Sequence, residues 1–397
     1  MKRQPIFLLI AVIFFTLLES CSTSPNSHTY IERLGTDTIS VETFSRSNNS
    51  YEGKLLIRMP ATQIATFKTK LNQTGLVSIM NIEWRTPSSN PGGPKPRAYS
   101  VAIKDDTTAT VHMTGVWRGK DIDTTYQMSV PNGAVPGFGK EPPALATFSQ
   151  IIHQANLKNN NSSYSTNILI PGSNRQIKTT LTHLGGDTLS LRMFGYSYLA
   201  TVNSNNNISW YSAQKTTVKT VTKSASNVNL EQVASRFARL DAEGRGMPIA
   251  SPLDSAMATL DGAHLKIIYS RPSMRGRKIW GSLVPYDTVW RTGANAATQF
   301  STNKDLMVGN TKVPAGTYTL YSIYTPDSGK LIINSQTGQW GTVYNESRDF
   351  ARIPMEKSNT DLHEEFAISI DTTGGKGYIR LAWDTTQYQV PFKVINN

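Results

Sequence analysis

The chain has 397 residues, and its 40 Lys and Arg against 28 Asp and Glu give a net charge of +12. This length suggests two or three domains, and the basic residues are scattered with no run of five or more like charges, which argues against a nucleic-acid-binding protein. We interpret the charge as a solvated surface beside an anionic membrane. The single cysteine excludes a disulfide within the chain.

The N-terminal segment has the organisation of a secretory signal. Two basic residues precede a short apolar run, residues 6–18, and Cys21 follows soon after. The run is shorter than the roughly 20 residues that a transmembrane helix needs. Leu18–Cys21 resembles a bacterial lipobox, whose cysteine is acylated, although Glu19 is unusual in that motif. An ordinary cleaved signal with an incidental cysteine is the alternative interpretation.

We therefore expect residues 1–20 to be a lipoprotein signal peptide and residues 21–27 to be a flexible tether. The tether lacks the acidic run that some Gram-negative lipoproteins use for export to the cell surface. This resemblance favours a lipid-anchored protein of the outer membrane that faces the periplasm. Its expected partner is the membrane, through a lipid on Cys21.

Alternation of apolar and polar residues predicts a β-rich domain over residues 28–225. Segments such as 65–71 and 177–181 alternate, and Asn72–Gly75 and Leu184–Asp187 supply turns between strands. Roughly a dozen short strands joined by tight turns predict an antiparallel meander that is closed or half-closed into a barrel.

One segment of this domain has helical instead of strand periodicity. Apolar residues recur at helical spacing over residues 145–155, directly after two prolines. Such a helix could plug a β cavity that holds an apolar ligand, or it could simply cover the open side of the sheet. The Pro-rich and Gly-rich loops 87–96 and 131–139 would form the rims of such a cavity.

Residues 226–250 are predicted to form a helical linker between two β domains. Asn229 is a good N-cap, and Val233, Phe237 and Leu240 share one helical face. Gly244 and the glycine and proline that follow it would end the helix.

The last part of the chain, residues 251–397, carries a series of motifs. They are Tyr269–Pro272, Gly276–Arg277, Trp290–Asn295, Pro314–Leu320, Trp340–Gly341 and Trp383. In this order they resemble the bacterial family called domain of unknown function 2911. Members are mostly exported or lipid-anchored, and the family has no established activity to carry over. In most relatives an acidic residue follows the asparagine of the Trp-Arg-Thr-Gly-Ala-Asn motif, whereas this chain has Ala296, so any chemistry of that carboxylate would be lost here.

The strand pattern after the motifs predicts an antiparallel β-sandwich for residues 251–397. Together with the N-terminal domain it makes an all-β protein: a meander or barrel-like domain with one helix, a short helical linker and a C-terminal sandwich. Residues 303–314 and 327–330 are expected to be connecting turns.

The loop over residues 271–297 concentrates arginines, tryptophans and glycines, and binding residues gather on loops that a rigid scaffold holds. Its arginines could converge on an anion, its aromatic rings could stack on a sugar, and its asparagine could orient the ligand. Alternatively, the arginines hold the loop's own carbonyls while the tryptophans pack in the core. We expect Arg291 to be a structural clamp and Arg277 to contact ligand. The candidate ligand-binding residues are Arg271, Arg277, Tyr286, Trp290, Arg291 and Asn295.

No catalytic motif identifies an enzyme. The six histidines lie apart without metal-ligand spacing, so we expect no metal and no cofactor, and His363–Glu365 is the best local acid–base cluster. The first hypothesis is a ligand-binding or interaction lipoprotein of the cell envelope, with an anionic or glycan ligand. A hydrolase or glycan-acting enzyme with an unrecognised site and a purely structural envelope protein are the alternatives.

Overall fold

The computed structural model describes residues 27–104, 107–117, 119–138, 144–373 and 376–395. The predicted signal segment and Cys21, on which the lipid anchor is predicted, lie outside these residues. The structure is 58% strand and 8% helix, so the all-β prediction is confirmed. Within the described ranges, neither helix has the length and apolar character to cross a membrane.

The N-terminal sheet has fifteen strands in the order β8-β7-β6-β5-β4-β3-β2-β1-β15-β14-β13-β12-β11-β10-β9. Two meanders therefore meet where β1 pairs with β15. The strands are β1 (Ser27–Leu34), β2 (Asp37–Arg46), β3 (Ser50–Ile57), β4 (Gln63–Leu71), β5 (Val77–Arg85), β6 (Arg97–Lys104), β7 (Thr108–Trp117), β8 (Lys120–Ser129), β9 (Val135–Pro136), β10 (Ser163–Ile170), β11 (Arg175–Gly185), β12 (Thr188–Met193), β13 (Tyr196–Val202), β14 (Ile208–Ser212) and β15 (Val221–Ala225).

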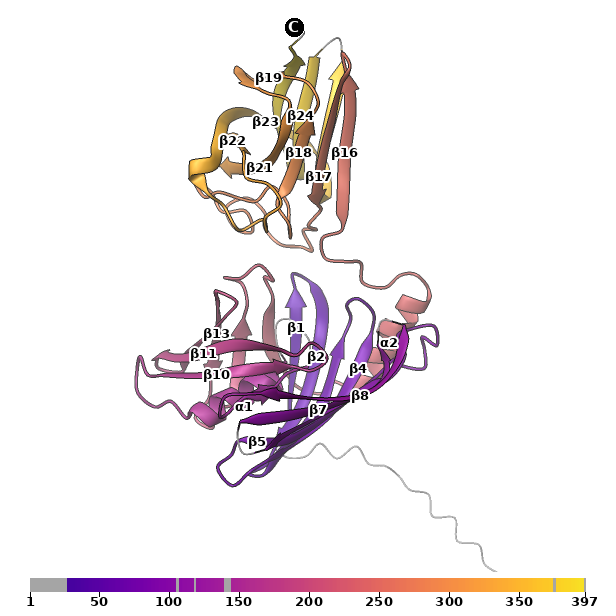
Figure 1. The fold of residues 1–397 in the computed structure, drawn as a ribbon, viewed down its shortest axis with the longest axis vertical. Coiled ribbons are helices and arrows are strands. Elements are labelled where there is room, and N and C mark those ends of the chain that lie inside the picture. The colour runs from indigo at the N-terminus through magenta and orange to yellow at the C-terminus, as the bar shows by residue number, and fades with distance from the viewer. Residues whose placement is uncertain (1–26, 105–106, 118, 139–143, 374–375, 396–397) are drawn as a thin grey trace, which may run out of the picture.

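The sheet curls until its two ends approach each other (Figure 1). The Tyr126 hydroxyl of β8 accepts a hydrogen bond from the Gly172 backbone N–H at 3.0 Å, and the Gln176 side chain donates to the Ser129 carbonyl at 2.6 Å. These contacts join β8 to the β10–β11 hairpin at the other end of the sheet. The domain is thus a nearly closed barrel.

The hairpin of β4 and β5 shows why these segments form strands. Phe67 and Leu71 are buried while Lys68 and Lys70 are exposed, as the alternating sequence predicts. The Asn72 side chain accepts hydrogen bonds from the next turn residues, which fixes the turn between the strands. Hydrophobic burial and turn chemistry specify the same register here.

Helix α1 (Leu145–Ala155) lies inside the curled sheet (Figure 1). Its first eight residues are all buried, and the Phe148 ring lies 5.1 Å from the Tyr211 ring of β14. The helix has no capping side chain of its own. Instead, the buried Glu42 carboxylate of β2 accepts the backbone N–H groups of Leu145 at 2.7 Å and Ala146 at 2.8 Å. A strand residue therefore caps the helix that fills the barrel.

Helix α2 (Leu230–Ala242) belongs to the N-terminal sheet by its contacts. The Asn229 side chain accepts from the Gln232 N–H at 3.0 Å, as its predicted N-cap role requires. Leu230 and Phe237 pack on the outer face of β2–β4, and the Asp241 carboxylate accepts from the Thr62 N–H at 2.7 Å. The connecting helix is therefore fixed to the first sheet along its whole length.

The C-terminal sheet has nine strands in the order β16-β17-β18-β21-β22-β23-β24-β19-β20. Strand β23 pairs first with β22 and then with β24, which joins the two halves of the sheet around one core. The strands are β16 (Leu253–Leu260), β17 (Ala263–Ser270), β18 (Thr298–Thr302), β19 (Leu306–Val308), β20 (Thr311–Val313), β21 (Gly316–Tyr324), β22 (Gly329–Asn334), β23 (Asp349–Thr373) and β24 (Lys376–Val394), with a short 3-10 turn at Glu346–Arg348.

Two features of this sheet differ from the sequence expectation. Residues 303–314, expected to be a turn, contain the β19–β20 hairpin, which adds to the edge of β24. Strand β23 also begins at residue 349, well before the apolar stretch that predicts it. Polar strand segments escape recognition because their stability comes from ladder partners distant in sequence.

Candidate functional site

The predicted loop runs from Arg271 to Ala297 between β17 and β18, and its tryptophans are packed against the core. The Trp290 ring lies 5.0 Å from Phe366 and 5.8 Å from Trp383, and its backbone bridges to Ser322. Trp280 packs in the same way, 4.9 Å from Tyr324. These rings anchor the loop to the sandwich.

Arg271 is held by two carboxylates from different strands. Its guanidinium pairs with Asp254 of β16 at 3.1 Å and also with Glu365 of β23. The three groups are each about one-third exposed, with side-chain exposures of 34–36%. Arg271 thus ties β16 to β23 across the sandwich, and Glu365 of the predicted acid–base cluster takes part in this contact.

Arg277 and Arg291 both hold backbone carbonyls of the loop. Arg277 donates to Met274 at 2.8 Å and to Ser273 at 2.5 Å. Arg291 donates to Gly293 at 3.3 Å, while its Nη1 is buried without a hydrogen bond in the described structure. Burial lowers the pKa of both guanidiniums.

Tyr286 and Asn295 lie at other points of the loop. The Tyr286 ring covers Gly281, where an added Cβ would lie only 2.7 Å from the ring. Asn295 donates to the Ser251 carbonyl at 3.3 Å and to the Ser270 hydroxyl at 3.4 Å. The six candidate residues therefore do not line a single pocket.

Arg275 has the most extensive contacts of the loop arginines, although it is not among the candidates. Its side chain is only 4% exposed, and it pairs with Asp37 in the turn that joins β1 to β2. The Arg275 carbonyl accepts from the Thr36 N–H at 3.0 Å. A Cβ on Gly35, which has φ +62°, would lie 2.0 Å from that carbonyl oxygen, so glycine is required there. Arg275 therefore joins the two domains.

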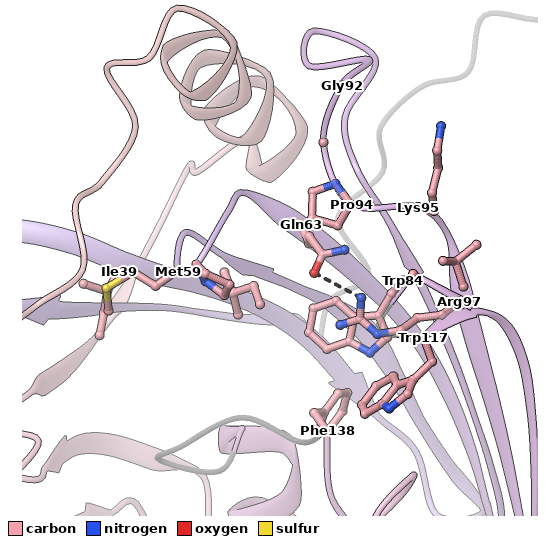
Figure 2. A pocket seen from close by; sticks show the side chains of 15 residues that line it. Ile39, Met59, Gln63, Trp84, Gly92, Pro94, Lys95, Arg97, Trp117 and Phe138 are labelled. Atoms are coloured by element: carbon pink, nitrogen blue, oxygen red, sulfur yellow. Dashed lines mark hydrogen bonds between the residues drawn. The ribbon is translucent and has the colours of Figure 1, made fainter. Parts of the chain in front are cut away.

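A cavity of about 830 Å³ lies in the N-terminal domain, at one side of the curled sheet. Figure 2 shows the side chains that line it. Trp84, Trp117 and Phe138 supply aromatic walls, and Lys95 and Arg97 supply positive charge. The other lining residues are Ile39, Ile57, Met59, Pro60, Gln63, Gly92, Gly93, Pro94, Val116 and Gly119.

Arg97 lies between the two tryptophans of this wall (Figure 2). Its guanidinium carbon is 4.9 Å from the centre of the Trp84 ring and 5.9 Å from that of Trp117, distances at which a cation and an aromatic face attract. Its Nη1 donates to the Gln63 side chain at 3.2 Å. Stacking and this hydrogen bond hold the charge in one position at the wall.

Three donors beside the cavity are buried without a hydrogen-bond partner in the described structure: Trp84 Nε1, Arg97 Nε and Gln63 Nε2. Unmade hydrogen bonds of buried polar groups are costly, and all three of these atoms are donors. No Asp or Glu is among the described residues that line the cavity.

Only indirect features of the sequence point to this cavity. The loops 87–96 and 131–139, interpreted as possible rims, do border it through Pro94 and Phe138. The tryptophans and Arg97 come from β5, β6 and β7, and nothing in the local pattern marks them as cavity residues. Over the described residues, no group of three or more His, Cys, Asp or Glu is placed to hold a metal ion.

Comparison with known proteins bears on the C-terminal domain. Residues 251–392 match the model of the family described as "Protein of unknown function (DUF2911)". The resemblance inferred from the motifs is therefore confirmed over this third of the chain. The search of curated proteins finds no match. Among solved structures, a DUF1089 family protein from Pseudomonas aeruginosa is similar with a TM-score of 0.32 and 10% identity, over 45% of this chain and 92% of that one.

Proposed function

We propose that this protein is a lipid-anchored ligand-binding protein of the bacterial cell envelope. The cavity of the N-terminal domain is its binding site, and the ligand is an amphipathic anion with an acyl-like body. The observation that carries the proposal is the aromatic wall of Trp84 and Trp117 with Arg97 fixed between them, in a cavity of about 830 Å³. Ligand pockets commonly combine apolar walls with a few placed polar groups.

The lining supports this class of ligand in two ways. Ile57, Met59 and Phe138 offer apolar surface, where burial stabilises a hydrocarbon chain by about 0.8 kcal/mol per CH₂. Arg97 and the exposed Lys95 offer two positive charges, and arginine is suited to carboxylate or phosphate. An acyl chain with an anionic head group matches both.

The direct test compares laurate with dodecanol, which has the same chain length and no charge, on the purified protein by calorimetry. We expect laurate to bind about tenfold more tightly, a difference of about 1.4 kcal/mol. Lys95→Gln should reduce this preference, and Trp117→Ala should weaken both ligands because it removes apolar wall. Lys104→Gln, an exposed charge at the end of β6, is the matched control and should bind as the unchanged protein does.

Absence of laurate binding, or equal binding by the unchanged protein and Trp117→Ala, would rule out this site. Turnover of an ester of laurate by the purified protein would instead favour the enzyme hypothesis. The readouts differ because binding alone leaves the ligand chemically intact.

The envelope location is a separate part of the proposal. It is supported by the signal pattern and by Cys21 as the only cysteine of the chain. We expect Cys21→Ser to move the protein from the membrane fraction to the soluble fraction, because acylation is its anchor. Cell fractionation with metabolic labelling by a fatty acid measures this, and complete membrane retention of the variant would contradict it.

A further inference from the structure

A second cavity, of about 520 Å³, lies where the two domains meet, and we call it the junction cavity. It is bounded by the outer face of β1 and β15, by the loop before β15 and by Arg277 from the C-terminal domain. The described lining residues are Ile31, Arg33, Gly35, Gln214, Lys219, Val221, Lys223, Ser224, Ala225 and Arg277.

The strand register explains why cations gather there. Ile31 pairs with Lys223, and Arg33 pairs with Val221, so both side chains of each pair face outward from the sheet. Glu32 between them is turned inward, where its carboxylate accepts from the Ser40 hydroxyl at 2.7 Å. This face of the β1–β15 ladder therefore carries positive charge and no carboxylate.

The next acidic residue after Glu32 is also engaged. Asp37, in the turn beyond β1, pairs with the buried Arg275. Among the described lining residues, four are cations and none is Asp or Glu. The junction cavity is therefore positive without internal compensation.

Lys219, in the loop before β15, is held close to the other cations of this junction. Lys219 has a left-handed backbone, φ +61°, and its Nζ donates to the Gln214 carbonyl at 2.9 Å. Burial lowers the pKa of Lys219, and the positive charges of Arg291 and Arg277 lower it further. Holding like charges together in this way costs stability, and binding sites commonly accept such a cost.

We propose that the junction cavity binds a multivalent oxyanion, a small molecule or lipid head group that carries phosphate or carboxylate groups. Arg33, Lys223 and Lys219 hold it from the first domain, and Arg277 holds it from the second. The volume leaves room for a body larger than the anion itself, against Ile31 and Val221. A bound anion would stabilise the contact between the domains, because the charges that it neutralises come from both.

The first test measures pyrophosphate and citrate binding to the purified protein by calorimetry at low ionic strength, where exposed charges act most strongly. The double variant Arg33→Gln/Lys223→Gln removes two exposed charges from the cavity. We expect it to bind either anion at least tenfold more weakly than the unchanged protein. Lys70→Gln/Lys178→Gln, which removes two exposed strand lysines elsewhere, is the matched control and should retain the affinity.

Vesicles separate the two sources of the anion. If a lipid head group is the ligand, vesicles containing phosphatidylglycerol will bind the unchanged protein and the control. They will not bind the Arg33→Gln/Lys223→Gln variant, and neutral vesicles will bind none of the three proteins. Equal binding of both double variants to every anion and vesicle would overturn the proposal, as would no binding at all. Laurate binding should be the same in both double variants, so this result is independent of the cavity in the N-terminal domain.

Discussion

Replacing Glu42 by alanine is expected to lower the free energy of unfolding by about 3 kcal/mol, the upper range for leaving buried donors unsatisfied. The Glu42 carboxylate accepts the first two N–H groups of α1 at 2.7 and 2.8 Å, and the helix has no other side-chain cap. A negative charge at a helix N-terminus is also favourable for the helix dipole. Without it, two N–H groups would remain unpaired inside the barrel.

Denaturant unfolding followed by circular dichroism measures this change. Glu52→Ala is the matched control, because Glu52 lies on the neighbouring strand with a side chain 58% exposed and only a long contact to Lys68 at 3.9 Å. Its replacement should change stability by less than about 0.5 kcal/mol. Equal stability of the two variants would show that α1 does not depend on the strand residue for its cap.

The second large effect concerns the ion pair between the domains and depends on which partner is removed. The Arg275 side chain is 4% exposed, whereas that of Asp37 is 40% exposed. Asp37→Ala leaves a buried guanidinium without its partner and should cost about 3 kcal/mol. Arg275→Ala leaves a carboxylate that water can reach, and should cost about 1–2 kcal/mol.

Because the pair joins the domains, Asp37→Ala should also loosen their contact. Protease cleavage in the exposed stretch around Gly244 and Arg245 should become faster than in the unchanged protein, as local opening would allow. Asp187→Ala is the control, since Asp187 lies in a similar exposed turn, between β11 and β12. A larger destabilisation by Arg275→Ala than by Asp37→Ala would contradict the assigned burial.

Sequence reasoning succeeded where the signal is local. The hairpin of residues 63–85 follows from alternation plus the Asn72 turn, and the N-cap at Asn229 follows from side-chain chemistry within three residues. It was wrong for residues 303–314, expected to be a turn, because the hairpin of residues 306–313 depends on the edge of β24. Local patterns carry no information about a partner strand so far along the chain.

The candidate residues of the loop over residues 271–297 show the same limit of local sequence patterns. The sequence leaves open whether the arginines of residues 271–297 converge on a ligand or hold the loop itself. In the structure, Trp290 packs in the core and Arg271 bridges two strands. Nothing in the sequence marks Arg275 among these arginines, because its partner Asp37 lies 238 residues away in sequence. Only the contact between the domains distinguishes this arginine from its neighbours.

The sequence by itself determined the all-β class and the two regular helices, because strand alternation, helical spacing and caps act over a few residues. The sequence also determined the resemblance of the last third to a known family, because each motif is a short run of neighbouring residues. Tertiary structure alone decided where the cavities lie. The aromatic cavity needs the curl that brings Phe138 to Trp84 and Arg97, and the junction cavity needs Arg277 of one domain against β1 and β15 of the other. Both depend on distances between residues far apart in the chain, which sheet curvature and domain contact set and which no local pattern encodes.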